Sequence, residues 1–244
     1  MNGAVPFSPA KGDEYMESTS VLEALQQQIE EFLTSIGRPA QVFSLRPEKA
    51  ALLVIDMQQF SCAPKHGVQF PGLAATVDRI NALVDACHDQ GVPVIWVRHS
   101  FRVSETGDDA GLYPLFHKQP LSRGMFDAGP DTALYPAMHY DAAVDHVVFK
   151  NRYSAFAATN AELPDLLRRL AVEQLWVAGV VTNVCVESTA RDAMQRDYEV
   201  IMVADAVTSP FALAHAVTLL NFRVFFGDVR NMDEIISAMG IRGK

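Results

Sequence analysis

The sequence predicts an α/β fold built around a mainly parallel sheet, and three observations support this. Six short runs of apolar, often β-branched residues alternate along the chain with segments whose apolar residues recur at helical spacing. A strand, a helix and a second strand in succession require a crossover connection, which makes neighbouring strands parallel. The length of 244 residues, 49% of them hydrophobic, suits one large domain of this class.

The elements follow from local pattern, taken in chain order. The run 175–181 is apolar throughout, as expected for a strand that is buried on both faces. The expected strands are 51–56, 92–98, 145–150, 175–181, 198–205 and 222–226. The expected helices are 20–36, 72–90, 131–139, 160–170, 186–194, 210–220 and 232–239.

The N-terminal part of the chain is expected to form a separate segment, residues 1–44, ahead of the main domain, residues 45–244. Residues 1–17 are polar and contain two prolines, so we expect a surface-lying arm there. Ser20 and Glu23 have capping-box spacing and predict the start of a helix with one apolar face. That face packs either on the main domain, which we favour, or on another subunit.

Composition excludes several classes of protein. The longest apolar run is far short of the ~20 residues that a membrane span needs, and the N-terminus lacks the pattern of a secretory signal. We therefore expect no membrane association and a cytoplasmic location. The net charge of -9 and the lack of a Lys/Arg run disfavour nucleic acid as a partner. Cys62, Cys87 and Cys185 have no C-x-x-C spacing, which disfavours a disulfide framework and a zinc site.

Cys185 is the first candidate functional residue. It lies where the apolar strand 175–181 passes into a helix, and the unpaired amides of a helix N-terminus favour thiolate over thiol. Such a position suits a nucleophile. The alternative is that Cys185 is a small buried hydrophobe, as free cysteine often is and as we expect for Cys87.

Two more chemically active side chains end other predicted strands. Asp56 follows strand 51–56, and Lys150 closes strand 145–150. Either alone is commonplace, because Asp is frequent in turns and Lys at solvated strand ends. The carboxyl ends of parallel strands share one edge of the sheet, where ligands bind. Asp56, Lys150 and Cys185 are therefore expected to meet there and to supply the base, cation and thiol of a thiol hydrolase.

The segment 99–129 has no clear periodicity and is long for a connection, which is typical of a functional loop. Within and near it, His99, Arg102 and Tyr153 are candidate substrate contacts, although each has an alternative role in packing or at the surface. Cys62 follows Asp56 by six residues and is the rival nucleophile, with a structural role as the alternative.

At these residues the chain resembles the isochorismatase-like cysteine hydrolases, from about Arg46 to Met239. The likeness rests on ALLVIDMQ around Asp56, KNRYSAF from Lys150 to Phe156, and GVVTNVCVESTARDA from Gly179 to Ala193. It implies a three-layer α/β/α fold with a six-stranded, mainly parallel sheet. It also implies homo-oligomers, dimers or tetramers, as in most members.

The resemblance also implies roles for individual residues. It implies a catalytic triad of Cys185, Asp56 and Lys150, with the amides of Val181 and Cys185 as the oxyanion hole. The peptide Val180-Val181 occupies the position that is cis in relatives. Tyr153 matches a tyrosine of the ureidoacrylate enzymes.

Departures from the family pattern narrow the expected activity. Family members that hydrolyse isochorismate have glycine at the position of Cys185, so that activity is not expected. Nicotinamidases carry a metal-binding D-x-H pair, whereas this chain has only His66 between Asp56 and Gln69 and has VRHSFR after Trp96. We therefore expect neither a metal nor another cofactor.

KNRYSAF resembles the corresponding segment of ureidoacrylate and N-carbamoylsarcosine amidohydrolases, and His99 occupies the place of an asparagine in the former. The resulting hypothesis is a cysteine-dependent amidohydrolase that cleaves a linear amide or ureido C–N bond of a small-molecule substrate through a thioester. The alternatives are a non-catalytic binding or accessory subunit, and an enzyme of the same mechanism that acts on an ester or a nicotinamide-like amide.

Overall fold

The structure is a computed structural model, and it describes residues 12–63, 70–117, 122–159 and 162–240. The chain divides into two compact units, residues 1–40 and residues 41–244. Each unit is described by itself. Among the described residues, no helix is long and apolar enough to cross a membrane.

The first unit contains one long helix, α1 (Gly12–Ser35). It begins eight residues before Ser20, so the predicted capping box at Ser20 and Glu23 is wrong, and so is the arm over residues 12–17. Residues 1–11 of the expected arm lie outside the described residues.

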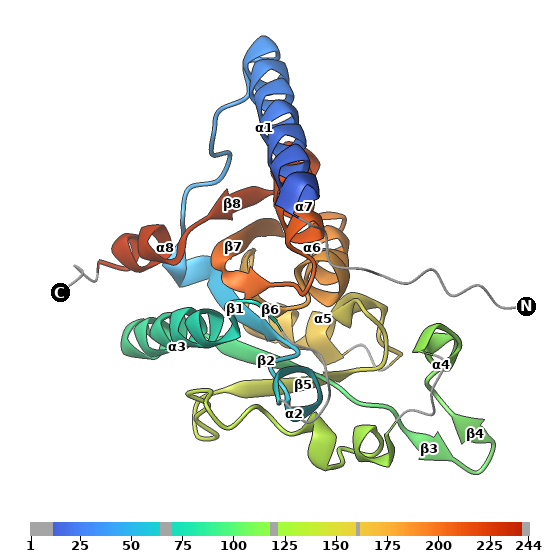
Figure 1. Cartoon of the computed structure of the whole chain (residues 1–244). Helices are drawn as coiled ribbons and strands as arrows, with labels where there is room; N and C mark the ends of the chain where they lie inside the picture. The colour runs from blue at the N-terminus through green and yellow to red at the C-terminus, as the bar shows by residue number, and fades with distance from the viewer. Residues whose placement is uncertain (1–11, 64–69, 118–121, 160–161, 241–244) are drawn as a thin grey trace, which may run out of the picture. The chain divides into compact units, whose positions relative to one another are not determined.

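The second unit is built on a six-stranded sheet in the order β5-β2-β1-β6-β7-β8, in which every pairing is parallel. Figure 1 shows these strands in the middle of the unit. Their bounds are β1 (Ala50–Ile55), β2 (Val94–His99), β5 (His146–Lys150), β6 (Gln174–Val180), β7 (Glu199–Thr208) and β8 (Asp228–Arg230). Every residue of β1 and β6 is buried, as expected for central strands covered on both faces.

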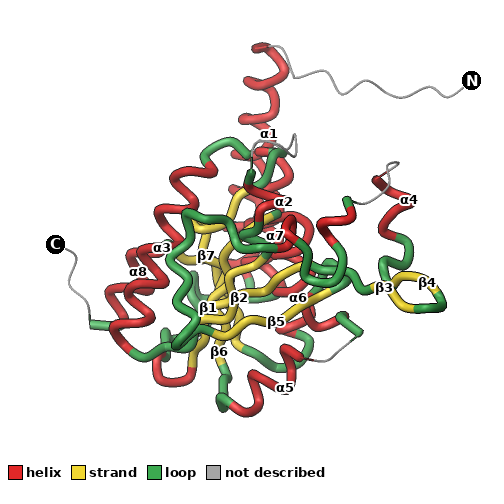
Figure 2. Tube along the Cα trace, turned by 90° about the horizontal axis from the view of Figure 1, so that it is seen from below, coloured by secondary structure: helices red, strands yellow, loops and turns green. Residues whose placement is uncertain are grey.

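Helices cover both faces of this sheet. Leu52 and Val54 of β1 pack on one side with α3 (Leu73–Gln90) and α8 (Met232–Ala238). Alternate residues of β1, including Leu53 and Ile55, pack on the other side with α5 (Glu162–Arg169), α6 (Glu187–Met194) and α7 (Ala212–Phe225). Figure 2 shows the helices on the two sides of the strands. The predicted three-layer fold with a six-stranded, mainly parallel sheet is confirmed.

Two predicted elements are wrong. Residues 222–226 were expected as the sixth strand, but 222–225 complete α7 and Phe226 is its C-cap, and the sixth strand is the short β8. Phe222 and Phe226 stack at helical spacing, with ring centroids 6.0 Å apart, so the apolar run serves a helix face instead of a strand. The predicted helix 131–139 is limited to the 3₁₀ turn η4 (Pro130–Thr132).

The long connection between β2 and β5 has structure of its own. It contains the hairpin β3 (Val103–Ser104) and β4 (Gly107–Asp108), the short helix α4 (Tyr113–His117) and the 3₁₀ turn η3 (Arg123–Met125). A small cluster of Phe101, Ala110 and Met125 holds this connection together, and Phe60 and Tyr113 pack against it. Phe60 belongs to α2 (Gln59–Cys62), directly after β1. The connection thereby lies over the carboxyl ends of the strands.

Candidate active site

The carboxyl ends of β1, β5 and the turn after β6 bring Asp56, Lys150 and Cys185 into one cluster. The Nζ atom of Lys150 donates to Oδ2 of Asp56 over 2.8 Å. A carboxylate oxygen of Asp56 and Sγ of Cys185 lie within 4.8 Å of each other, and a ring nitrogen of His99 lies within the same distance of both. All four side chains are buried. Residues far apart in the chain thus supply a carboxylate, an ammonium, a thiol and an imidazole to one site.

The backbone conformation around Asp56 determines the direction of its carboxylate. Asp56 follows the last residue of β1 in the left-handed region, with φ of 53°. Its amide still donates to the carbonyl of Val97 on β2, so the turn begins inside the sheet. Beside it, Gly179 of β6 lies so close to β1 that a Cβ there would be 2.1 Å from the carbonyl oxygen of Ile55. Only glycine permits this approach.

Cys185 lies in a single π-helical turn, η6 (Thr182–Val186), which leads into α6. The peptide Val180-Val181 before it is cis. The carbonyl of Val181 accepts the amides of Val184 and Val186, at 3.0 and 3.3 Å, and so closes the turn. Sequence periodicity predicts a simple strand-to-helix join here and does not reveal the wider turn, which π-helical geometry often marks at functional sites.

The electrostatics of the cluster differ from the expectation for a helix N-terminus. Burial raises the pKa of the Cys185 thiol, the charge of Asp56 raises it further, and Lys150 only partly offsets both. These effects favour the thiol over the thiolate, whereas the position at a helix N-terminus was expected to favour the thiolate. The thiol needs a base.

The pKa shifts of Asp56 and Lys150 suit removal of the proton from the Cys185 thiol. Burial raises the pKa of Asp56 and outweighs the opposing effects of Lys150 and Cys185, so the carboxylate is a stronger base than an exposed one. Burial lowers the pKa of Lys150, but Asp56 and an ionised Cys185 together raise it by more, which keeps the ammonium. Oδ1 of Asp56 has no nitrogen or oxygen partner among the described residues, so this atom is available to take the thiol proton.

The three predicted substrate contacts lie at different distances from this centre. His99 ends β2, is fully buried and has Nδ1 3.2 Å from Nζ of Lys150. Tyr153 is 36% exposed, and its phenol pKa is raised first by burial and then by the charge of Cys185.

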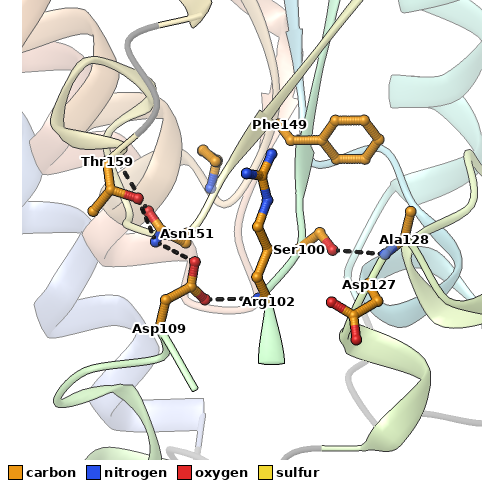
Figure 3. A pocket seen from close by; sticks show the side chains of 9 residues that line it. Ser100, Arg102, Asp109, Asp127, Ala128, Phe149, Asn151 and Thr159 are labelled. Carbon is orange, nitrogen blue, oxygen red and sulfur yellow. Dashed lines mark hydrogen bonds between the residues drawn. The ribbon is translucent and has the colours of Figure 1, made fainter. Parts of the chain in front are cut away.

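Arg102 lies in a neighbouring pocket of about 180 Å³. Figure 3 shows its side chain in that pocket, between Asn151 and Phe149. Its backbone amide donates to Asp109 over 2.7 Å, and its guanidinium lies 3.7 Å from Glu162. Lys150 also lines the pocket, so the pocket adjoins the catalytic cluster.

Two residues of the site were not predicted from the sequence. The buried side chain of Gln58 donates to the carbonyl of His99 over 3.1 Å and accepts its amide over 2.7 Å. The place of Gln58 in the motif around Asp56 was the signal in the sequence that could have pointed to it.

Tyr113 of α4 has its ring centroid 5.1 Å from that of His99 and 5.4 Å from that of Tyr153. Burial and then the charges of Cys185 and Asp56 raise its phenol pKa. It lies in a connection without periodicity, so no pattern pointed to it.

The cluster of Asp56, His99 and Cys185 has a donor set that suits a transition metal. The ammonium of Lys150, however, donates both to the Asp56 carboxylate and to Nδ1 of His99, so a metal ion would compete with a buried cation for the same lone pairs. The site as a whole, with its buried ammonium, therefore does not fit a metal. His66 lies outside the described residues.

The other thiols lie in apolar surroundings. Cys62 ends α2, and burial raises its pKa to about 11. Lys150 is not among the groups that act on it. Cys87 belongs to α3 and is fully buried in the core, and burial raises its pKa to about 12. Of the three thiols, Cys185 alone is coupled to both Asp56 and Lys150.

Comparison with known proteins gives a consistent picture. Residues 50–234 match the family model of the isochorismatase domain. Ureidoacrylate amidohydrolase RutB of Methylobacterium radiotolerans is 31% identical over 84% of this chain and 84% of its own length. Nicotinamidase 3 of Arabidopsis thaliana is 29% identical over 76% of this chain and 86% of its own.

Solved structures also resemble this protein. A cysteine hydrolase from Pseudomonas syringae pv. phaseolicola has a TM-score of 0.70 and 28% identity, covering 83% of this chain and 98% of its own. N-carbamoylsarcosine amidase from Thermoplasma acidophilum has a TM-score of 0.63 and 26% identity, covering 77% of this chain and 98% of its own. Sheet, site and sequence thus agree, and the chain belongs to the isochorismatase domain family.

Proposed function

We propose that this protein is a cysteine-dependent amidohydrolase that cleaves a linear amide or ureido C–N bond of a small molecule through a thioester intermediate. Hydrolysis of C–N bonds outside peptides is the activity named for the amidohydrolases to which the chain is similar, and the chain is an enzyme of that class. The observation that carries the mechanism is the buried contact of Lys150 with Asp56, 2.8 Å long, beside the thiol of Cys185.

The first step is proton transfer from sulfur to carboxylate. Asp56, whose pKa is raised by burial, accepts the proton of Cys185, and the ammonium of Lys150 stabilises the anion that forms on sulfur. The sulfur then attacks the carbonyl carbon of the substrate, and the carbonyl π pair moves to oxygen. The amides of Val181 and Cys185 are proposed to donate to that oxygen, and a lost donor of this kind costs about 100-fold or more in rate.

The second half of the reaction returns the proton. As the tetrahedral intermediate collapses, the C–N bond breaks and Asp56 donates its proton to the departing nitrogen, which leaves as ammonia or an amine. The acyl or carbamoyl group remains on Cys185 as a thioester. A water molecule, deprotonated by Asp56, then attacks that carbonyl. Sulfur leaves, takes back the proton and restores the resting thiol.

The substrate side of the site is proposed to consist of His99 and Tyr153, with Tyr113 beside them. Their rings form an aromatic wall next to Cys185, because the Tyr113 ring lies 5.1 Å from His99 and 5.4 Å from Tyr153. Such a wall suits a flat amide or ureido group. Arg102 is proposed to act further out, from the adjoining pocket. The likeness to a ureidoacrylate amidohydrolase and an N-carbamoylsarcosine amidase favours the ureido class.

A nicotinamide-like amide is the second candidate substrate, and the likeness to a nicotinamidase is the observation that favours it. The same chemistry at Cys185 serves both substrate classes, so only turnover separates them.

The test is turnover of ureidoacrylate, N-carbamoylsarcosine and nicotinamide, followed by release of ammonia or amine, with the wild type, Cys185→Ala and Cys62→Ala. We expect turnover of a ureido compound by the wild type and by Cys62→Ala. Cys185→Ala should lose at least about 1,000-fold in kcat. Full activity of Cys185→Ala, or loss of activity only with Cys62→Ala, would reject the assigned nucleophile.

A further inference from the structure

The ammonium of Lys150 has an acceptor for each of its three N–H bonds. Nζ lies 2.8 Å from Oδ2 of Asp56, 3.2 Å from Nδ1 of His99 and 3.2 Å from the carbonyl oxygen of Arg152. The side chain is fully buried, so water does not supply these partners. An ammonium has three donors and no acceptor, and the three contacts therefore fix its orientation completely.

This arrangement determines the tautomer of His99. Lys150 is in contact with the carboxylate of Asp56, with Nζ 2.8 Å from Oδ2, and this negative charge favours the ammonium. A charged ammonium only donates, so Nδ1 of His99 must accept. The imidazole is thus neutral, with its proton on Nε2.

The surroundings hold His99 in this role. The side chain of Gln58 binds the His99 amide and carbonyl together, at 2.7 and 3.1 Å, which fixes the backbone. The ring makes edge contacts with Phe60, Phe101 and Tyr113, with centroids 6.2, 4.7 and 5.1 Å away. The imidazole therefore has little freedom to turn its Nδ1 away from Lys150.

We propose that His99 is a positioning residue, which holds the Lys150 ammonium between Asp56 and Cys185 through Nδ1. This inference deepens the proposed function and concerns the same site. The ammonium must face the carboxylate and the sulfur to stabilise the anion as it passes from one to the other. Without Nδ1 of His99, the buried ammonium loses one of its acceptors and is destabilised. Lys150 then loses its proton more readily, and the sulfur loses the positive charge that favours thiolate.

Two amide side chains distinguish this role from direct substrate contact. The carboxamide of asparagine places its oxygen near the position of a histidine Nδ1, whereas glutamine reaches the position of Nε2. His99→Asn therefore keeps the acceptor for Lys150 and removes the Nε2 donor. His99→Gln does the reverse, and His99→Leu removes both. Asp56, Lys150, Cys185 and Tyr113 are the ionisable groups of the cluster around His99, and all remain unchanged in these variants.

The first measurement needs no substrate. The rate at which iodoacetamide alkylates Cys185, assigned by peptide mass spectrometry between pH 7 and 10, reports how readily the thiol ionises. We expect His99→Asn to stay within about threefold of the wild type. His99→Gln and His99→Leu should be slower by about 10- to 100-fold at pH 8, with the ionisation of Cys185 moved to higher pH. Equal or faster labelling in all three variants would overturn the proposal.

A Lys150→Met background supplies the control. There the Asn, Gln and Leu substitutions should alkylate at the same rate, because the group that His99 positions is gone. Persistent differences in that background would also overturn the proposal. Thermal melts of all variants identify any that fail to fold, and the Asn and Gln pair remains informative because the two differ only in where the amide lies.

The second measurement uses whichever ureido compound the wild type turns over. A positioning role lowers kcat in His99→Gln by a larger factor than it raises KM, and His99→Asn restores kcat. If instead His99→Gln keeps activity and His99→Asn raises KM, Nε2 contacts the substrate and the positioning role is rejected. If no compound is turned over, the proposed substrate class is in doubt, while the alkylation rates still decide the role of His99.

Discussion

Oδ2 of Asp56 and Nζ of Lys150 lie 2.8 Å apart, although 94 positions separate the two residues in the chain, and neither side chain is more than 4% exposed. An ion pair sealed in this way carries a large cost of desolvation, which the fold must offset elsewhere. Its position next to Cys185 indicates that it is kept for chemistry rather than for stability.

Removal of one member of this pair should destabilise the protein strongly. Lys150→Met leaves Asp56 buried without its counterion, and we expect a loss of about 3–5 kcal/mol in the free energy of unfolding at pH 8. Asp56→Asn in the same background should recover part of the loss, because the orphaned charge is gone. Urea denaturation measures both. The surface pair of Arg168 and Asp165 is the matched control, and Arg168→Met should cost less than about 1 kcal/mol. Equal effects at the two pairs would contradict this reading.

Asp56→Asn should separate thiol reactivity from catalysis. The charge of Asp56 raises the pKa of Cys185, so its removal lowers that pKa and speeds alkylation of Cys185 at neutral pH. Turnover should nevertheless fall by at least about 100-fold, because no group is left to carry the proton to the departing nitrogen. Alkylation kinetics and ammonia release from the same preparation test this. Full turnover by Asp56→Asn would show that the carboxylate does not carry the proton as inferred.

The pH dependence of activity should reflect the raised pKa of Asp56. The carboxylate must be ionised to accept the thiol proton, so kcat/KM should fall as the pH drops through its pKa in the folded protein. Burial raises that pKa, so the acid limb should lie above the ordinary carboxyl range of about pH 4. A profile of kcat/KM against pH measures it. An acid limb at or below that range would contradict the environment described for Asp56.

Gly179→Ala should disrupt the junction of β1 and β6 beside the catalytic residues. The added Cβ would meet the Ile55 carbonyl oxygen at 2.1 Å, and φ of 115° is unfavourable for alanine. We expect a loss of about 3 kcal/mol or more in the free energy of unfolding. Gly91→Ala is the control: φ is 68°, nothing lies within 4 Å of the new Cβ, and only about 1 kcal/mol is expected. Denaturant titration measures the free energy of unfolding of both variants. Similar losses at Gly179 and Gly91 would show that the positive φ alone, and not the contact with Ile55, causes the loss.

Much of the fold could be predicted because it depends on local patterns. Runs such as 175–181 are apolar and β-branched over their whole length, and buried parallel strands require that composition. The failure at 222–226 has a physical cause. A short apolar run satisfies a helix face and a strand equally well, and the packing of Phe222 against the sheet decided between them.

The candidate site, like the fold, was predictable from the sequence only in part. By itself, the sequence determined that Asp56, Lys150 and Cys185 would share one edge of the sheet, because parallel strands present their carboxyl ends together. Only the tertiary structure decided that the surroundings of Cys185 favour the thiol over the thiolate, since burial of a charge depends on every element packed around it. It alone also revealed that Nδ1 of His99 lies 3.2 Å from Nζ of Lys150, because a contact between residues 51 positions apart leaves no periodic trace in the chain.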